Sequence, residues 1–292
     1  MTRIVGVMSL VVMAGCAIDP KESTTYSVPN WTGDGRIVAS KTTMKSHKNL
    51  ISSSVLDEYR QAIVVMDADG SNEHELFTVG DNGIRLIAMS ASGNVVAYIG
   101  ARLRVVVNEG GWREKWSVDI NEGGARSYDN LQINPAESKL YASEGTYQFK
   151  VFSMDGTEVA HQLVGGGGGF KDNNTIVFNQ TNLEIGYTSE FSTQTGLVAQ
   201  MGRGFAFNLY VPSENAVIYL GGSYNTNYSE KLYFNSNTIS TTNFSYSPYS
   251  YSDFTGRHLS PEGKKLIMSY DSVDDVGIYV LDIDRNRIDR LK

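Results

Sequence analysis

The chain of 292 residues carries 25 basic and 32 acidic side chains, which gives a formal charge of −7. This negative charge repels phosphate backbones, so we expect no nucleic-acid ligand. A single cysteine excludes an intrachain disulfide, and no apolar run after residue 15 is long enough to span a bilayer as a helix.

The first fifteen residues have the layout of a secretory signal peptide. Arg3 supplies a positive charge, residues 4–13 are largely apolar, and Ala14 and Gly15 are small. The apolar run is too short for a permanent membrane helix. We therefore expect residues 1–15 to be removed, which leaves a formal charge of −8 because Arg3 is lost.

The stretch "VMAGC" (12–16) resembles the bacterial lipobox, although Met13 stands where that pattern prefers leucine. The resemblance implies that Cys16 is acylated, as by palmitate, and becomes the new N-terminus. Ala17 in place of aspartate implies sorting to the outer membrane, facing the periplasm. Several acyl chains anchor a protein stably, whereas one does not. The alternative is an ordinary signal peptide with Cys16 incidental. The polar residues 16–29 are expected to form a tether to the anchor.

Six similar blocks follow, each a polar turn and then a short β-branched or aromatic strand. The aligned turn positions, 36 to 58 residues apart, are Gly35, Gly93, Ser138, Asn174, Asn215 and Gly263. About four strands fit in each block, as "IRLIAMS", "NVVAYIG", "RLRVVVNEG" and "EKWSVDI" show for the second. Such a period without helical patterning predicts an all-β, six-bladed β-propeller with about four antiparallel strands per blade, spanning residues 30–292. Either residues 24–30 supply the inner strand of the first blade, or the ring closes by packing alone.

Three segments resemble TolB-type propeller repeats, with their S-P-D-G turn and a closing "iyvmd-dG" pattern. They are "IVVMDADGSNEHELFT" (63–78), "VFSMDGTEVAHQL" (151–163) and residues 260–291, and the other blocks follow the pattern in outline. The resemblance implies a six-bladed propeller. TolB has an additional N-terminal α/β domain that we do not expect here, so the resemblance does not carry over its partner contacts.

We expect neither a metal nor a cofactor. The four histidines share no ligand spacing; they are His47, His74, His161 and His258. "MDADGSNE" (66–73) lacks further acidic ligands for calcium and is interpreted as a hairpin turn. Ser223 in "GGSYN" is interpreted as a turn residue, not a hydrolase nucleophile. The run "GGGGG" (165–169) is no phosphate loop. It predicts either a flexible connection or a close approach of backbones.

Two sets of side chains are candidate binding residues. Four arginines precede expected inner strands and form a possible ligand rim; they are Arg85, Arg126, Arg203 and Arg257. Guanidiniums gathered around the channel would bind a carboxylate-bearing or anionic ligand, or they are scattered loop residues paired with local acids. The tyrosine-rich stretch 223–254 is either a partner surface or an aromatic cover of its own blade. Its candidate contacts are Tyr224, Tyr228, Tyr246, Tyr249 and Tyr251.

These observations predict a monomeric, non-enzymatic, lipid-anchored envelope protein. Its propeller would serve as a scaffold for a protein or peptide partner, and it would touch the membrane only through its lipid. The alternative is a carbohydrate-binding or carbohydrate-cleaving propeller with a site at the axial channel. Because the same fold hosts many activities, fold alone does not separate the two hypotheses.

Overall fold

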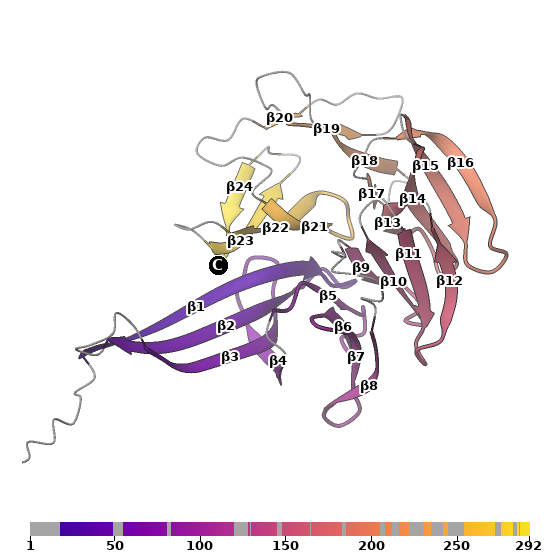
Figure 1. The fold of residues 1–292 in the computed structure, drawn as a ribbon. Coiled ribbons are helices and arrows are strands. Elements are labelled where there is room, and N and C mark those ends of the chain that lie inside the picture. The colour runs from indigo at the N-terminus through magenta and orange to yellow at the C-terminus, as the bar shows by residue number, and fades with distance from the viewer. Residues whose placement is uncertain are drawn as a thin grey trace, which may run out of the picture.

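The computed structural model describes residues 18–48, 55–80, 83–119, 128, 130–144, 148–163, 165–182, 185–204, 208–211, 216–221, 230–234, 242–244, 254–271, 276–282, 285 and 287–292. The strands in these ranges form six four-stranded antiparallel sheets, and each sheet is built from four consecutive strands (Figure 1). None of the described residues forms a helix long and apolar enough to cross a membrane.

The first three sheets use the following strands. The first has β1 (Ile18–Trp31), β2 (Ile37–Lys48), β3 (Val55–Met66) and β4 (His74–Val79). The second has β5 (Leu86–Met89), β6 (Val95–Ile99), β7 (Leu103–Asn108) and β8 (Trp112–Val118). The third has β9 (Asn130–Ile133), β10 (Lys139–Glu144), β11 (Gln148–Ser153) and β12 (Glu158–Gln162).

The last three sheets follow in the same way. The fourth has β13 (Gly166–Phe170), β14 (Thr175–Asn182), β15 (Ile185–Ser192) and β16 (Val198–Gly204). The fifth has β17 (Asn208–Val211), β18 (Ala216–Gly221), β19 (Glu230–Phe234) and β20 (Thr242–Phe244). The sixth has β21 (Phe254–Leu259), β22 (Lys265–Asp271), β23 (Val276–Asp282) and β24 (Arg287–Arg290).

The same turn joins the first and second strands of the first, second, third and sixth sheets, because one polar side chain after the first strand accepts hydrogen bonds from backbone amides at the start of the second. Thr32 Oγ1 accepts from the Arg36 amide at 2.9 Å, and Ser260 Oγ accepts from the Lys265 amide at 3.1 Å. Asn134 and Ser90 act likewise in the third and second sheets. Three of the predicted turn glycines adopt positive φ; they are Gly35, Gly93 and Gly263.

The core lies between the sheets, which stack face against face. Val38 and Ile63 of the first sheet pack with Ile87 of the second, and the second packs on the third around Leu131. Aromatic rings fill the space between the third and fourth sheets, where Phe149 and Phe178 have centroids 5.1 Å apart. This stacking buries both faces of small sheets that could not be stable alone.

The architecture is therefore an all-β propeller with four-stranded antiparallel blades, as predicted. Side-chain packing is described for five of the six sheets, and in the fifth sheet only the backbone strands are described.

The first and last sheets meet directly. Strand β1 contacts β21, β22 and β23, and Trp31 and Ile37 pack against Ile267 and Ile278. Residues 24–30 thus provide the innermost strand of the first sheet, one of the two possibilities that the sequence left open. Residues 18–29, which we expected in the tether, lie in β1 because their backbone pairs with β2.

One glutamate links both ends of the described chain. Glu73 accepts hydrogen bonds from Tyr26 and Lys41, each at 2.7 Å, and lies 3.3 Å from the Lys292 ammonium. Burial raises the pKa of Glu73, but these hydrogen bonds outweigh burial and bring it below its ordinary value. The carboxylate therefore fastens the N-terminal strand and the C-terminal residue to the same sheet.

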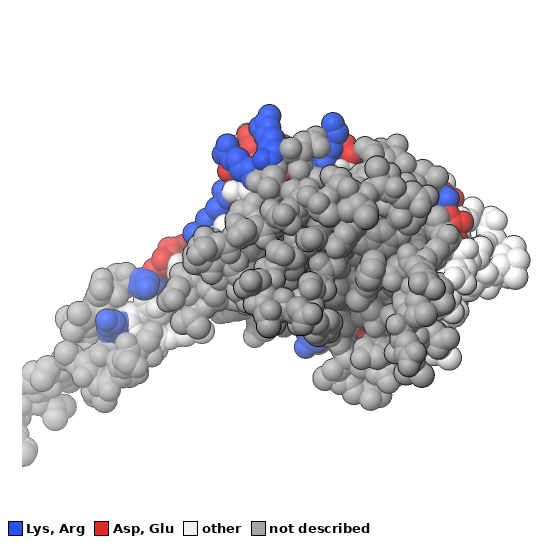
Figure 2. Space-filling view, turned by 90° about the horizontal axis from the view of Figure 1, so that it is seen from above, with Lys and Arg blue, Asp and Glu red and all other residues white. Residues whose placement is uncertain are grey.

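The first sheet extends well beyond the region in which the sheets stack on one another, which we call the disc. We call this part the projecting sheet and define it as residues 18–24 of β1, 43–48 of β2 and 55–60 of β3 (Figure 1). Six or seven residues per strand correspond to about 20 Å. Basic and acidic side chains lie close together along it (Figure 2). The repeat pattern did not predict this extension.

Candidate functional site at the propeller axis

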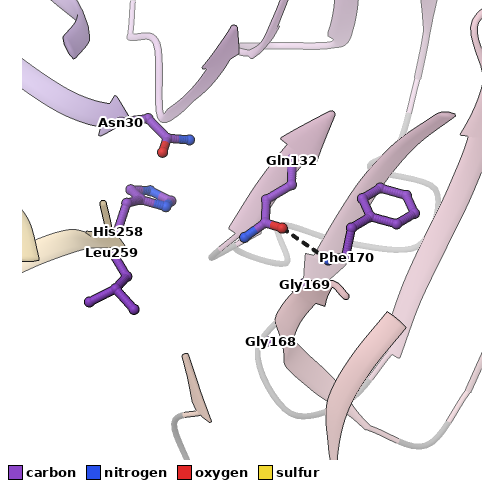
Figure 3. Close-up of a pocket in the computed structure, with 7 residues that line it drawn as sticks. All are labelled: Asn30, Gln132, Gly168, Gly169, Phe170, His258 and Leu259. Carbon is purple, nitrogen blue, oxygen red and sulfur yellow. Dashed lines mark hydrogen bonds between the residues drawn. The ribbon is translucent and has the colours of Figure 1, made fainter. Parts of the chain in front are cut away.

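A small polar cavity lies where inner strands of four sheets converge (Figure 3). Its volume is about 50 Å³, which is enough for a few water molecules. The lining residues come from β1, β9, β13 and β21; they are Asn30, Gln132, Gly168, Gly169, Phe170, His258 and Leu259. The cavity thus gathers residues that are more than two hundred positions apart in the sequence.

His258 is the titratable side chain among these lining residues, and it is 6% exposed. Burial lowers the pKa of His258 to about 4, so the imidazole is neutral at physiological pH. Its ring lies beside Asn30 in the cavity (Figure 3). A neutral imidazole can accept or donate one hydrogen bond per nitrogen, but it offers no charge to an anion.

The amide side chains around the cavity connect neighbouring inner strands. Asn30 Nδ2 donates to the Ile87 carbonyl at 2.8 Å and lies 3.4 Å from the Leu131 carbonyl. Gln132 Oε1 accepts from the Phe170 amide at 3.1 Å (Figure 3). These bonds join inner strands that belong to different sheets, so they hold separate blades together.

The glycine run forms strand β13 and comes very close to its neighbours. A Cβ on Gly168 would lie 1.9 Å from the Val177 carbonyl oxygen, and one on Gly169 would lie 2.1 Å from Gln132 Oε1. Gly168 also has φ of +68°, a conformation that favours glycine. The close approach of backbones, one of two interpretations of "GGGGG", is confirmed.

A buried amide oxygen lies next to this strand. Asn130 Nδ2 donates to the Gly168 carbonyl, whereas Asn130 Oδ1 is buried and has no hydrogen-bond partner among the described residues. An unpaired buried oxygen is unfavourable unless water or a ligand reaches it. Ordered water in the axial region would satisfy it.

The structure describes the side chain of only one of the four arginines in the predicted ligand rim. Arg85 is exposed and immediately precedes β5. Arg203 lies in β16, an outer strand, and Arg257 lies in β21, but the side chains of both are outside the described part. Arg126 lies outside the described residues. The convergence of the four guanidiniums therefore stays a prediction.

Other predicted residues fall outside the described ranges or are explained by turns. Cys16 and Ser223 lie outside them, as do the five candidate tyrosines, Tyr224, Tyr228, Tyr246, Tyr249 and Tyr251. The turn in 66–73 is a hairpin turn, in which the Gly70 amide donates to the Asp67 carbonyl at 2.9 Å. The described ranges contain no group of three or more His, Cys, Asp or Glu side chains placed to hold a metal ion.

The axial cavity was not predicted, although the repeat contains a signal for it. Three of its polar residues occupy the same repeat position, two residues before the side chain that caps the turn. They are Asn30 before Thr32, Gln132 before Asn134, and His258 before Ser260. Polar residues at one inner-strand position in several repeats indicate a shared polar axis.

Comparison with known proteins supports the fold. Neither known protein families nor characterised proteins match the sequence. Among solved structures, the chain is similar to a putative TolB from Agrobacterium tumefaciens, with 15% identity, a TM-score of 0.57, and coverage of 81% of this chain and 90% of that one. TolB from Acinetobacter baumannii gives 11% identity, a TM-score of 0.56, and 92% and 79% coverage. An oligogalacturonate lyase from Vibrio parahaemolyticus has 10% sequence identity and a TM-score of 0.52, and the match covers 94% of this chain and 100% of that one. At these identities the likeness establishes a shared propeller fold alone.

Proposed function

We propose that this protein is a non-enzymatic, lipid-anchored envelope protein whose TolB-like propeller serves as a protein-binding scaffold. The observation that carries the proposal is the projecting sheet, which leaves the disc and exposes Leu56 by 58% and Tyr59 by 40%. Exposed apolar side chains on a projecting element are typical of a contact surface, because they add nothing to the core of their own protein.

The scaffold in this proposal is a closed ring of six blades. The innermost strands are neighbours in the order β1, β5, β9, β13, β17, β21 and back to β1. Among the described strands, no sheet mixes strands from the two chain ends, so closure would depend on packing between the first and last sheets and on the Glu73 contacts. The chain is proposed to act as a monomer.

The small axial cavity favours a scaffold over an enzyme. Pockets for small molecules usually measure about 300–1,000 Å³, several times the volume found here. A glycosidase needs two facing carboxylates, and the described residues that line the cavity include none. This weakens the carbohydrate hypothesis, while the rim arginines and the tyrosine-rich stretch remain proposed partner contacts.

The lipid anchor has a direct test. In bacteria grown with a clickable palmitate analogue, the full-length protein should become labelled, and the Cys16→Ser variant should lose the label and leave the membrane fraction. Labelling that persists in the variant, or a wild-type protein that stays unlabelled and soluble, contradicts the anchor.

Partner binding is tested in the same cells with a photo-crosslinking amino acid placed at single positions of the full chain. Suitable positions are Leu56 on the projecting sheet, and Tyr224 and Tyr249 in the tyrosine-rich stretch. Leu197, which is 69% exposed in the connection between β15 and β16, is the control position. We expect a defined protein adduct from at least one test position and none from Leu197. A protein that forms no adduct but binds oligosaccharides on a glycan array would support the carbohydrate alternative.

A further inference from the structure

One edge of the projecting sheet has no strand beside it among the residues that the structure describes. Strand β4 pairs with β3 only from Gln61, opposite Val79, to Val65, opposite His74. The preceding residues 55–60 pair with β2 on one side, and no described strand pairs with them on the other. This open edge measures about 20 Å and continues the line that β4 occupies nearer the disc. Backbone amides and carbonyls at such an edge can accept an added strand.

A β-bulge places two apolar side chains on one face of this edge. Leu56 is opposite Ser46 and Tyr59 is opposite Met44, with Asp57 as the extra residue between them. Directly opposite residues share a face of the sheet, as do residues two apart in one strand. Leu56 and Tyr59 therefore lie on the same face although they are three positions apart.

The charged side chains at this edge are already compensated. Glu58 pairs with Lys45 at 2.8 Å, Asp57 with His47 at 2.7 Å, and Arg60 with Glu75. Lys45 with Glu58 and Arg60 with Glu75 are ion pairs, and the Asp57 carboxylate has the His47 ring as its hydrogen-bond partner. A strongly charged partner segment would find no unpaired opposite charge there, whereas an uncharged segment would disturb none of the three pairs.

We propose that residues 55–60 of β3 bind an extended, uncharged segment of a partner protein, which adds to the sheet as a further strand beyond β4. Its backbone would bond to the open edge, and its apolar side chains would lie beside Leu56 and Tyr59. This inference rests on the proposed function, since it names the kind of segment that the scaffold would recognise. It concerns the edge alone and not the propeller axis.

The test uses the purified full-length protein in detergent micelles and capped eight-residue peptides as probes. One peptide alternates Thr and Val. A second has the same side chains with every backbone nitrogen methylated, which blocks strand pairing on both edges of the peptide. A third and a fourth carry Glu or Lys at every second position. Hydrogen exchange of the amides in residues 55–60 is the readout, because an added strand protects outward-facing amides.

We expect the Thr/Val peptide to slow exchange in residues 55–60 at least tenfold and the methylated peptide to have no effect. Tyr59→Asp should weaken binding at least tenfold by placing a charge on the apolar face. Leu197→Asp introduces the same charge at an exposed apolar residue outside the projecting sheet and should leave binding unchanged. Because both substitutions are at exposed positions, both variants should fold.

Three results would overturn the inference. The first is unchanged exchange with every peptide, and the second is equal binding of the methylated or charged peptides. The third is protection that grows with protein concentration alone and accompanies a dimer in sedimentation, which would make a second copy the occupant. If crosslinking instead captures a partner through Tyr224 or Tyr249 while this edge stays unprotected, the proposed function holds and this inference fails.

Discussion

Replacing His258 with glutamine should remove a distinct part of the protein's sensitivity to acid. Burial lowers the pKa of His258 to about 4, against 6.5 for the free side chain. As the pH falls below about 6.5, the imidazole of this residue becomes protonated in the unfolded chain. In the folded chain it stays neutral down to about pH 4. This group therefore leaves the free energy of unfolding unchanged above about pH 6.5 and lowers it as the pH falls from 6.5 to 4.

The size of the effect follows from the same two pKa values. Between pH 7 and pH 5, the unfolded state gains about 2 kcal/mol relative to the folded state from this one group. Urea unfolding, followed by fluorescence of the three tryptophans, measures the free energy of unfolding at both pH values. His258→Gln removes the titrating group, so the variant should lose about 2 kcal/mol less than the wild type between pH 7 and pH 5.

The absolute stability of the variant does not enter this comparison, because only the change with pH is compared. Carboxylates titrate alike in both proteins and largely cancel. Asp155, for example, has its pKa lowered to about 2 by hydrogen bonds from Ser153 and Thr157. Equal losses in the two proteins would refute the reasoning, as would an NMR titration that places the pKa of folded His258 near 6.5.

Two further substitutions test the packing and the junction of the chain ends. Gly168→Ala should lower stability by at least about 3 kcal/mol in a thermal or urea melt, because the methyl group meets a carbonyl oxygen. Gly167→Ala is the matched control, with φ of +64° but open space around its Cβ, and should cost only about 1–2 kcal/mol. Glu73→Gln should lower the free energy of unfolding by about 1–3 kcal/mol at pH 7, because a charged acceptor is lost. The difference in stability between this variant and the wild type should shrink as the pH falls below about 4.5, where the carboxylate becomes protonated. Glu75→Gln removes an exposed ion pair and should change stability by less than about 1 kcal/mol, so equal effects of the two glutamate variants would contradict the role of Glu73.

The fold was predictable because the local chemistry of each repeat agrees with the tertiary structure. Gly35, Gly93 and Gly263 adopt the positive φ that their turns require, and short apolar runs such as 95–99 are buried strands. Such signals are local and recur, so one repeat confirms the interpretation of another.

The projecting sheet and the axial cavity were not predictable in the same way. Residues 41–48 and 55–60 are polar enough to be interpreted as a loop, and their strands are held by cross-strand pairs such as Lys45 with Glu58. The cavity depends on which inner strands face one another. The repeat position that Asn30 and His258 share marks both as axial residues, but they meet because the first and last sheets are neighbours, which the repeat pattern does not specify.

The proposed anchor and the proposed peptide edge together define an orientation. Strand β1 begins at Ile18, at the outer end of the projecting sheet, and Cys16 is only two residues earlier in the sequence. A lipid on Cys16 would therefore hold the outer end of this sheet near the membrane, with the disc about 20 Å farther away. Residues 55–60 would then lie between the membrane and the disc. A partner strand that adds there has to be presented close to the lipid surface, as the flexible segment of another anchored protein would be.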